Sequence, residues 1–129
     1  MYTRTHSDVA GTETDVIWGN GTSLRLLTTR DNMGFTICYT TVWKGTRSRL
    51  QYRNHLEACY CISGFGQIAD PFTGYVLDIQ PGTLYVLDQH DDHFLIAGEE
   101  QDLILLSVFT PPLNGTEVHN LNNDGGSHY

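Results

Sequence analysis

The sequence predicts an all-β protein, an antiparallel sandwich or barrel with little helix. Short segments rich in Val, Ile, Leu, Tyr, Phe and Thr recur at even spacing along most of the 129 residues. Turn-forming pairs such as Lys44-Gly45 and Pro81-Gly82 separate them, and no amphipathic helix of any length interrupts them. Short strands alternating with turns over a whole chain are typical of sandwiches and barrels.

Nine strands are expected, each bounded by residues that favour turns. They cover residues 24–28, 34–43, 49–52, 58–63, 66–69, 75–79, 84–87, 94–97 and 103–109. The polar segment 1–20 leaves both a short strand and a short helix open. Residues 113–129 are rich in Asn and Gly and should be irregular. One interpretation is a frayed tail. The other is a lid over the site, because Glu117 and His119 would point to the same side of an extended chain.

Length and charge narrow the class of protein. One domain, residues 1–129, is expected, because a chain of this size forms one core. Seven Lys and Arg against fifteen Asp and Glu give a net charge of −8, which argues against nucleic acid or anionic membrane as a partner. No apolar stretch resembles a signal peptide or could span a bilayer. Cys59 and Cys61 share a strand face and cannot easily form a disulfide, so reduced thiols in the cytoplasm are expected.

Two motifs place three metal-ligand side chains in register. Glu57 and Gly64 have six residues between them, and His93 follows the Pro81-Gly82 turn and a short strand that carries Tyr85. This skeleton is typical of a cupin, a jelly-roll β-barrel, although the two histidines that usually precede the glutamate are absent. Taken singly, the three could be a strand-edge charge, a core aromatic and a loop residue. Their shared register favours a site for one cation, and hard oxygens with one imidazole suit Fe(II), with Zn(II) and Mn(II) as alternatives.

From about Arg25 to His119 the chain resembles the ectoine synthase family of cupins. Few other cupins share the Asn-His-Leu-Glu or the Pro-Pro-Leu-Asn-Gly string. The resemblance rests on Arg25-Leu26-Leu27, Asp31-Asn32-Met33-Gly34-Phe35, Tyr52-Arg53-Asn54-His55-Leu56-Glu57, Tyr60-Cys61-Ile62, Pro81-Gly82-Thr83-Leu84-Tyr85, Asp88-Gln89-His90-Asp91, Phe109-Thr110-Pro111-Pro112-Leu113-Asn114-Gly115 and Glu117-Val118-His119.

The resemblance implies an enzyme that closes N-γ-acetyl-L-2,4-diaminobutyrate to the cyclic amidine ectoine, a compatible solute, with loss of water. It implies a metal, most often iron(II), held by Glu57, Tyr85 and His93, and a head-to-tail homodimer. It also implies a substrate pocket drawn from Arg25, Thr40, Tyr52, His55, Phe109, Glu117 and His119.

The chemistry suggests roles for some of these residues. Arg25 would pair with the substrate carboxylate, and Tyr52 or His55 would move protons between the amine and the leaving hydroxyl. Glu117 and His119 would complete the closure of the site.

Four positions depart from the family pattern, at Gly21, Cys38, Ser107 and Thr110. The family commonly has tryptophan where this chain has Gly21, and Trp18 is a candidate substitute. Such changes alter pocket walls and leave the metal positions untouched, so a related N-acyl diamino acid or the hydrolytic direction stays open. A non-enzymatic, ligand-binding cupin is a second hypothesis. A sugar or thiol isomerase or dioxygenase is a third, disfavoured by the missing histidines.

Overall fold

The computed structural model describes residues 1–122 and 126–129, and its strands form two sheets that face each other. The elements are α1 (His6–Val9), β1 (Asp15–Ile17), β2 (Gly21–Leu27), a 3-10 turn (Thr29–Asp31), β3 (Thr36–Val42), β4 (Arg47–Gln51), β5 (Leu56–Ser63), β6 (Gly66–Ala69), β7 (Val76–Ile79), β8 (Leu84–Leu87), β9 (His93–Ala97), β10 (Leu103–Thr110) and β11 (Ser127–His128).

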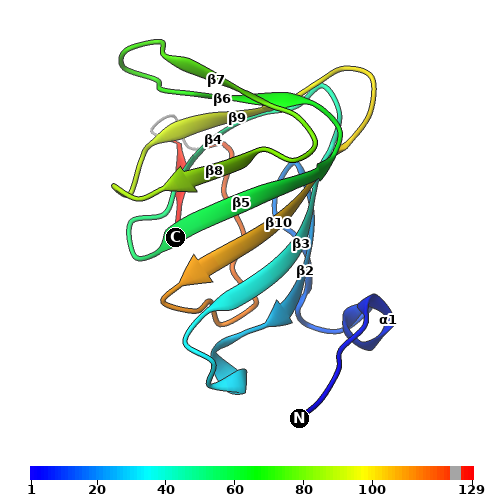
Figure 1. The fold of residues 1–129 in the computed structure, drawn as a ribbon. Helices are drawn as coiled ribbons and strands as arrows, with labels where there is room; N and C mark the ends of the chain where they lie inside the picture. Colours follow the sequence, from blue (N-terminus) through cyan, green and yellow to red (C-terminus); the bar gives the residue numbers. More distant parts are fainter. Residues whose placement is uncertain (123–125) are drawn as a thin grey trace.

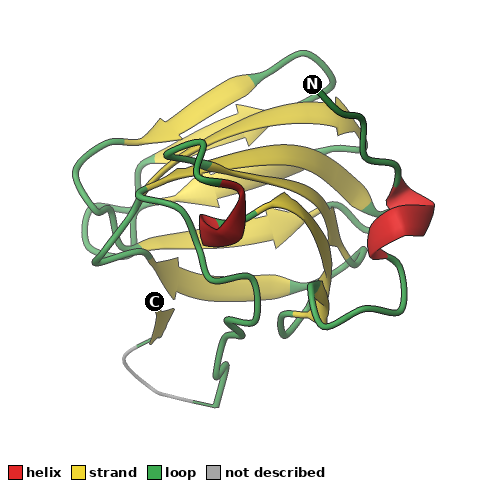
Figure 2. Cartoon of the chain, turned by 90° about the horizontal axis from the view of Figure 1, so that it is seen from below, coloured by secondary structure: helices red, strands yellow, loops and turns green. Residues whose placement is uncertain are grey.

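The larger sheet has the order β1-β2-β3-β10-β5-β8 and the smaller has β11-β4-β9-β6-β7 (Figure 1). All described pairings are antiparallel except that of β11 with β4. The two short helical segments lie on loops outside the strands (Figure 2). The prediction of an all-β fold with little helix is therefore confirmed. No helix in the described part of the chain is long and apolar enough to cross a membrane.

Strand register creates a row of inward side chains across the larger sheet. Arg25 on β2 pairs with Cys38 on β3, which pairs with Ser107 on β10. Ser107 in turn pairs with Cys59 on β5, and Cys59 with Tyr85 on β8. All five residues are buried. Because inward and outward residues alternate along a strand, this row brings residues from five separate strands to one interior surface.

The outer face of the same sheet has the opposite character. The outward residues of β5 and β8 include Tyr60, Ile62, Leu84 and Val86, which are all exposed. On β3, β5, β8 and β10 the only charged residue is Glu57, and it points inward. The inner face therefore mixes polar side chains with apolar ones of the core, whereas the outer face of these strands is largely apolar.

All nine expected strands are present, and the differences lie at their ends and in the two terminal segments. β3 begins at Thr36 because Gly34 lies at φ +83°, outside extended geometry. β2 begins earlier than expected, at Gly21, because this glycine packs directly against the Thr41 carbonyl oxygen of β3. The N-terminal segment holds both alternatives that the pattern left open, α1 and β1.

The C-terminal tail was expected to be irregular. It ends in a two-residue strand, β11, so the tail is anchored at its end as well as at its start. Gly126 packs against the side chain of Arg49 on β4, directly before β11 pairs with β4. The expected irregular range also includes residues 123–125, which lie outside the described part.

Candidate active site

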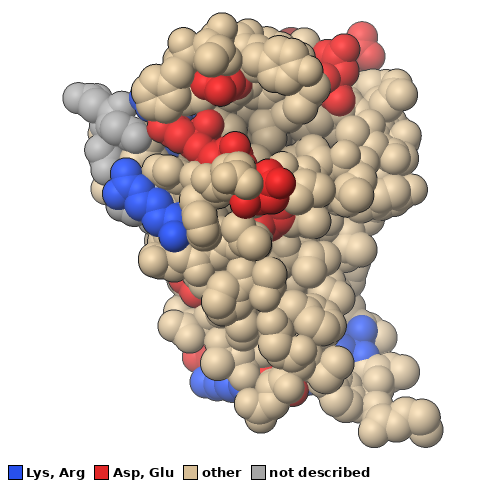
Figure 3. Space-filling model, turned by 60° about the vertical axis from the view of Figure 1, so that its left-hand side comes forward, with Lys and Arg blue, Asp and Glu red and all other residues tan. Residues whose placement is uncertain are grey.

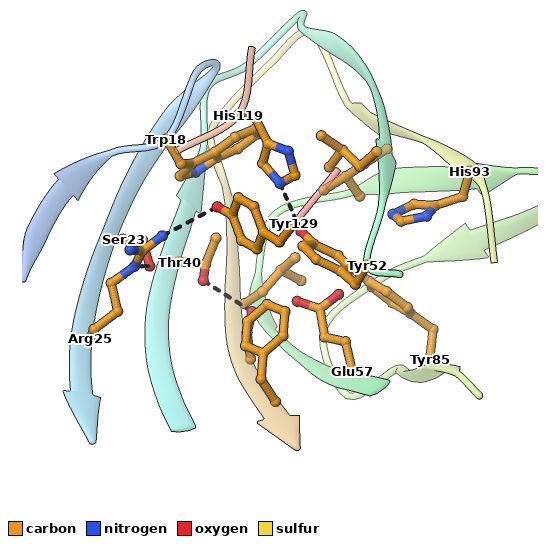
Figure 4. A pocket seen from close by; sticks show the side chains of 15 residues that line it. Trp18, Ser23, Arg25, Thr40, Tyr52, Glu57, Tyr85, His93, His119 and Tyr129 are labelled. Carbon is orange, nitrogen blue, oxygen red and sulfur yellow. Dashed lines mark hydrogen bonds between the residues drawn. The ribbon is translucent and has the colours of Figure 1, made fainter. Parts of the chain in front are cut away.

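A cavity between the two sheets collects most of the side chains that the sequence singled out (Figure 4). Its free volume is about 30 Å³, room for a water molecule or two. Fifteen residues line it: Trp18, Ser23, Arg25, Thr40, Leu50, Tyr52, Glu57, Tyr85, His93, Leu95, Leu105, Ser107, Phe109, His119 and Tyr129. Figure 4 shows Arg25 at one side and Glu57, Tyr85 and His93 at the other, with Tyr52 and Tyr129 between them.

The first side, here called the arginine end, consists of Ser23, Arg25 and Thr40. The Arg25 side chain is only 2% exposed. Its Nε donates to Ser23 Oγ at 3.0 Å and its Nη1 donates to the Gly115 carbonyl oxygen at 3.0 Å. Its Nη2 donates to the Tyr129 hydroxyl at 3.3 Å. Thr40 Oγ1 lies 3.0 Å from Ser107 Oγ. This end therefore holds a buried, oriented cation surrounded mainly by neutral oxygens.

The opposite side, the carboxylate end, consists of Glu57 on β5, Tyr85 on β8 and His93 at the start of β9. All three are buried, at 6%, 7% and 3% exposure. Burial raises the pKa of Glu57 to about 8, with a side-chain hydrogen bond between Glu57 and Cys59 acting in the opposite direction. Burial also raises the pKa of the Tyr85 phenol well above its ordinary value. Burial lowers the pKa of His93.

The chemistry of this donor set fits a cation. Among the described residues no salt bridge includes Glu57, so its buried carboxyl group lacks a cationic neighbour that would favour ionisation. His93 Nδ1 lies 3.0 Å from the Asp91 carbonyl oxygen, which can only accept a hydrogen bond. Nδ1 therefore carries the proton and Nε2 keeps its lone pair, as in a metal-binding histidine. Across the described residues no three His, Cys, Asp or Glu side chains group closely enough for a metal, so any site here depends on the Tyr85 phenol.

Between the two ends, Tyr52 connects to the tail through His119. The Tyr52 hydroxyl lies 3.3 Å from His119 Nε2, and His119 Nδ1 lies 2.8 Å from Ser127 Oγ. The Tyr52 ring packs edge-on against Phe109, with ring centroids 5.0 Å apart. Burial, followed by the nearby Glu57, raises the pKa of Tyr52 well above its ordinary value, so the phenol is neutral and keeps its proton. These contacts form a hydrogen-bonded chain from the cavity to the tail.

Two of the candidate residues, His55 and Glu117, lie outside the cavity lining. His55 Nδ1 donates to the Pro111 carbonyl oxygen at 2.7 Å, and its ring packs edge-on against Phe109 at 6.3 Å. The Glu117 carboxylate accepts the backbone N–H groups of Asn114 and Gly115. Against the opposing effect of burial, these backbone hydrogen bonds lower the pKa of Glu117. Glu117 Oε1 lies 3.9 Å from Arg25 Nη1, so this carboxylate contacts the arginine from outside the cavity lining.

The structure identifies the side chain that occupies the space beside Gly21. A Cβ at Gly21 would lie 2.9 Å from Trp18 Nε1 and in hard contact with the Thr41 carbonyl oxygen. Trp18 is 4% exposed, donates from Nε1 to Thr41 O at 3.3 Å, and packs edge-on against His119 at 6.0 Å. Trp18 therefore supplies an aromatic wall of the cavity beside Gly21, the position at which the family pattern has a tryptophan.

Sequence reasoning missed Ser23 and Tyr129, which both line the cavity. Alternation along the strand could have found Ser23, because it lies two residues before Arg25 and so on the same face. No local signal marks Tyr129, whose place depends on the pairing of β11 with β4.

Comparison with known proteins shows the family of this chain. The sequence profile of the family described as "Ectoine synthase" matches residues 1–127. An L-ectoine synthase of Vibrio parahaemolyticus is 42% identical over 122 residues, covering 95% of this chain and 94% of the relative. Another, from Desulfatibacillum aliphaticivorans, is 48% identical over 121 residues, covering 92% of each.

Solved structures are similar as well. The crystal structure of ectoine synthase from P. lautus has a TM-score of 0.81 and 37% identity, covering 89% of this chain and 81% of that one. A polyketide cyclase from Streptomyces resistomycificus, at 18% identity, covers 85% and 79% of the two chains with a TM-score of 0.69 and supports the fold alone. The profile, the relatives and the fold agree, and the chain belongs to the ectoine synthase family.

Proposed function

We propose that the chain, an enzyme of the ectoine synthase family and hence a hydro-lyase, forms ectoine in the cavity between its two sheets. The observation that carries this proposal is that one small interior space has a buried guanidinium at one end and a carboxyl, a phenol and an imidazole at the other. The substrate N-γ-acetyl-L-2,4-diaminobutyrate has a carboxylate at one end and an amide carbonyl at the other. Its two ends thus match the two ends of the cavity.

The arginine end would bind the substrate carboxylate. Arg25 is fixed by hydrogen bonds to Ser23 Oγ and to Gly115 O, so its guanidinium loses little further freedom when an anion arrives. A guanidinium can pair with both oxygens of a carboxylate at once, which also sets the orientation of the ligand. Phe109 and Trp18 would supply apolar walls beside the substrate chain.

The carboxylate end would hold the metal through Glu57, Tyr85 and His93, and Fe(II) suits this mixture of oxygens and one imidazole, with Zn(II) and Mn(II) as alternatives. A bound divalent cation supplies Lewis acidity, which polarises an amide carbonyl and stabilises negative charge on its oxygen. The raised pKa of Glu57 supports this role, since a cation would restore the ionised carboxylate that burial disfavours.

Ring closure needs the α-amino group to attack the acetamide carbon and water to leave. The amine loses protons and the former carbonyl oxygen gains them, so a nearby proton carrier is required. Tyr52 meets this need best, because its hydroxyl faces the cavity and contacts His119 Nε2 at 3.3 Å. His55 is the alternative carrier, although the structure turns its Nδ1 to the Pro111 carbonyl oxygen.

The cavity also favours the reaction by shape. A coiled substrate held at both ends approaches the geometry of attack, an advantage of up to roughly 7–11 kcal/mol in well-oriented intramolecular reactions. The cavity has room for only a water molecule or two, which favours loss of water over rehydration of the amidine. His119, with Glu117 behind Arg25, would complete this closure.

Of the four departures from the family pattern, Ser107 lines the cavity, whereas Cys38 and Thr110 lie outside its lining. Cys38 and Ser107 are neighbours in the inward row of the larger sheet. Thr110 is exposed, and its hydroxyl donates to the Gly34 carbonyl oxygen at 3.3 Å, so it does not shape the cavity. Trp18 would supply beside Gly21 the aromatic surface that this glycine lacks. These placements favour the family's own substrate over a different N-acyl diamino acid.

We also propose that the chain pairs with a second copy through the apolar outer face of the larger sheet. Leu84 and Val86 on β8 lie beside Tyr60 and Ala58 of β5, and Leu106 of β10 continues the apolar surface. In Figure 3 acidic side chains gather over the upper part of the molecule, and a broad area below them carries no charged group. A contiguous group of exposed apolar side chains such as these is typical of an interface. Leu84→Glu should convert the dimer to a monomer, and the change in mass can be measured by light scattering.

The activity is tested by incubating purified protein with N-γ-acetyl-L-2,4-diaminobutyrate and following the ring protons by NMR. One sample is loaded with Fe(II) without oxygen, and a second is stripped by a chelator. Ectoine formation only in the loaded sample supports the proposal. Ectoine formation in both samples would contradict the metal dependence. Release of acetate would instead indicate deacetylation of the substrate, and conversion of added ectoine to the acetylated diaminobutyrate would indicate the hydrolytic direction. Three buried free cysteines fit a reducing compartment such as the cytoplasm and favour work under reducing conditions.

A further inference from the structure

Tyr129, the last residue of the chain, lies inside the cavity and not on its rim. Its ring stacks on the His119 ring, with centroids 4.2 Å apart and planes at 15°. The same ring packs edge-on against Tyr52 at 5.2 Å. Its hydroxyl accepts from Arg25 Nη2 at 3.3 Å and donates to the Glu117 carbonyl oxygen at 3.4 Å. The phenol thus lies between the arginine end and Tyr52 (Figure 4).

The space left with Tyr129 in place is too small for the substrate. The free volume is about 30 Å³, whereas pockets that take small organic ligands begin near about 300 Å³. The Tyr129 hydroxyl also occupies a donor of Arg25 that a carboxylate oxygen would need. The substrate and the Tyr129 side chain therefore compete for the same volume and for the same nitrogen.

We propose that Tyr129 is an internal competitor of the substrate carboxylate at Arg25 and that it must leave the cavity before the substrate can bind. The proposal rests on the proposed function, since it takes Arg25 as the carboxylate subsite. It makes Tyr129 a determinant of substrate affinity, because the binding energy of the substrate has to exceed that of the phenol.

The attachment of Tyr129 suits a side chain that leaves and returns. Among the described residues, two backbone hydrogen bonds fix the residue itself, from Tyr129 N to Gln51 O at 3.2 Å and from Arg53 N to Tyr129 O at 3.1 Å. β11 has two residues and lies at the edge of its sheet. A short edge strand with few backbone hydrogen bonds opens more readily than a central strand. His119 keeps a second anchor, since its backbone N–H donates to Trp18 O at 2.8 Å, so it can stay in place while Tyr129 departs.

Kinetics of three variants with the Fe(II)-loaded enzyme and the acetylated diaminobutyrate test the proposal. Tyr129→Ala removes the competitor and should lower KM about tenfold. Tyr129→Phe removes the hydroxyl but keeps the ring, and should lower KM about threefold. Tyr2→Ala, a change at an exposed tyrosine near the other terminus, is the matched control and should leave KM unchanged. A KM that rises in Tyr129→Ala would overturn the proposal, because Tyr129 would then be a wall that holds the substrate.

A binding measurement separates this inference from the proposed function. Fluorotyrosine is incorporated into Glu57→Gln, and the ¹⁹F resonance of Tyr129 is assigned by its absence in Glu57→Gln with Tyr129→Phe. Adding the acetylated diaminobutyrate should move this resonance to the position of an exposed tyrosine. An unchanged resonance at saturating ligand would refute the displacement of Tyr129. Failure of the wild-type enzyme to close the ring would instead refute the proposed function, even if the resonance moves.

Discussion

The two ends of the cavity are equally buried but differ in how their charges are balanced. At the arginine end the guanidinium of Arg25 has four oxygen neighbours from Ser23, Gly115, Tyr129 and Glu117. At the carboxylate end Glu57 has no ion-pair partner among the described residues, and burial raises its pKa to about 8. Protein groups surround the charge of Arg25 at the arginine end. The buried carboxyl group of Glu57 at the carboxylate end instead requires a cation or a proton from solution.

This difference indicates how the two ends enter the reaction. The arginine end is organised before any ligand arrives, so it suits recognition of a fixed group. The carboxylate end changes state with what it binds, so it suits chemistry in which charge develops. The two ends can differ in this way because they lie on separate strands. Arg25 is on β2, whereas Glu57 and Tyr85 are on β5 and β8.

The largest expected effect comes from removing the charge at the carboxylate end. Glu57→Gln keeps the shape of the side chain but cannot form a carboxylate, so ring closure should fall about 10³-fold. Metal content after dialysis, measured by mass spectrometry, should fall with it. Cys61→Ala is the matched control, because Cys61 is buried on the same strand and the same face but outside the cavity lining. Full metal retention in Glu57→Gln would show that the ion lies elsewhere.

A smaller effect is expected from disturbing the aromatic wall at the arginine end. Gly21→Ala places a methyl group against the Thr41 carbonyl oxygen and Trp18, and should cost about 3 kcal/mol of unfolding free energy. The indole would be displaced towards the cavity, so KM should rise as well. Gly34→Ala is a useful control, since a Cβ there meets open space and only the φ of +83° resists it, at about 1 kcal/mol. Equal losses in urea denaturation of the two variants would contradict the packing argument.

The strands could be predicted from the sequence because alternation and turn residues are local signals. The same signals put Glu57, Tyr85 and His93 on inward faces, and the structure places all three in one cavity, while their role as ligands stays a prediction. The tail could not be predicted, because Tyr129 reaches the cavity only through contacts with β4 that are distant in sequence. The place of Trp18 was equally hidden, since it depends on the close approach of Gly21 to β3.

Stability of the metal-free protein should depend on pH through the carboxylate end. The folded-state pKa of Glu57, about 8, lies above its ordinary value of 4.5, so its contribution to stability is complete below pH 4.5 and is lost as pH rises through 8. Between pH 5 and pH 7 the loss should be about 2–3 kcal/mol, measured by urea denaturation in a chelator. Glu57→Gln should remove most of this slope, and Mn(II) should remove it in the wild type. A slope that persists in Glu57→Gln would assign it to other groups.

The smallest effect should come from the hydroxyl of Thr40, which is one neutral contact at the well-balanced end. Its Oγ1 lies 3.0 Å from Ser107 Oγ, and Ser107 also accepts a hydrogen bond from the Cys59 thiol at 3.4 Å. Thr40→Val keeps the shape and removes this contact, so stability should fall by about 1 kcal/mol and kcat/KM by about fivefold. Thr41→Val, the next residue on the opposite face of β3, should change neither. Because Ser107 joins Thr40 to Cys59 and so to the row that ends at Tyr85, a larger loss of metal affinity than of substrate affinity in Thr40→Val would show that the two ends are coupled through the floor of the cavity.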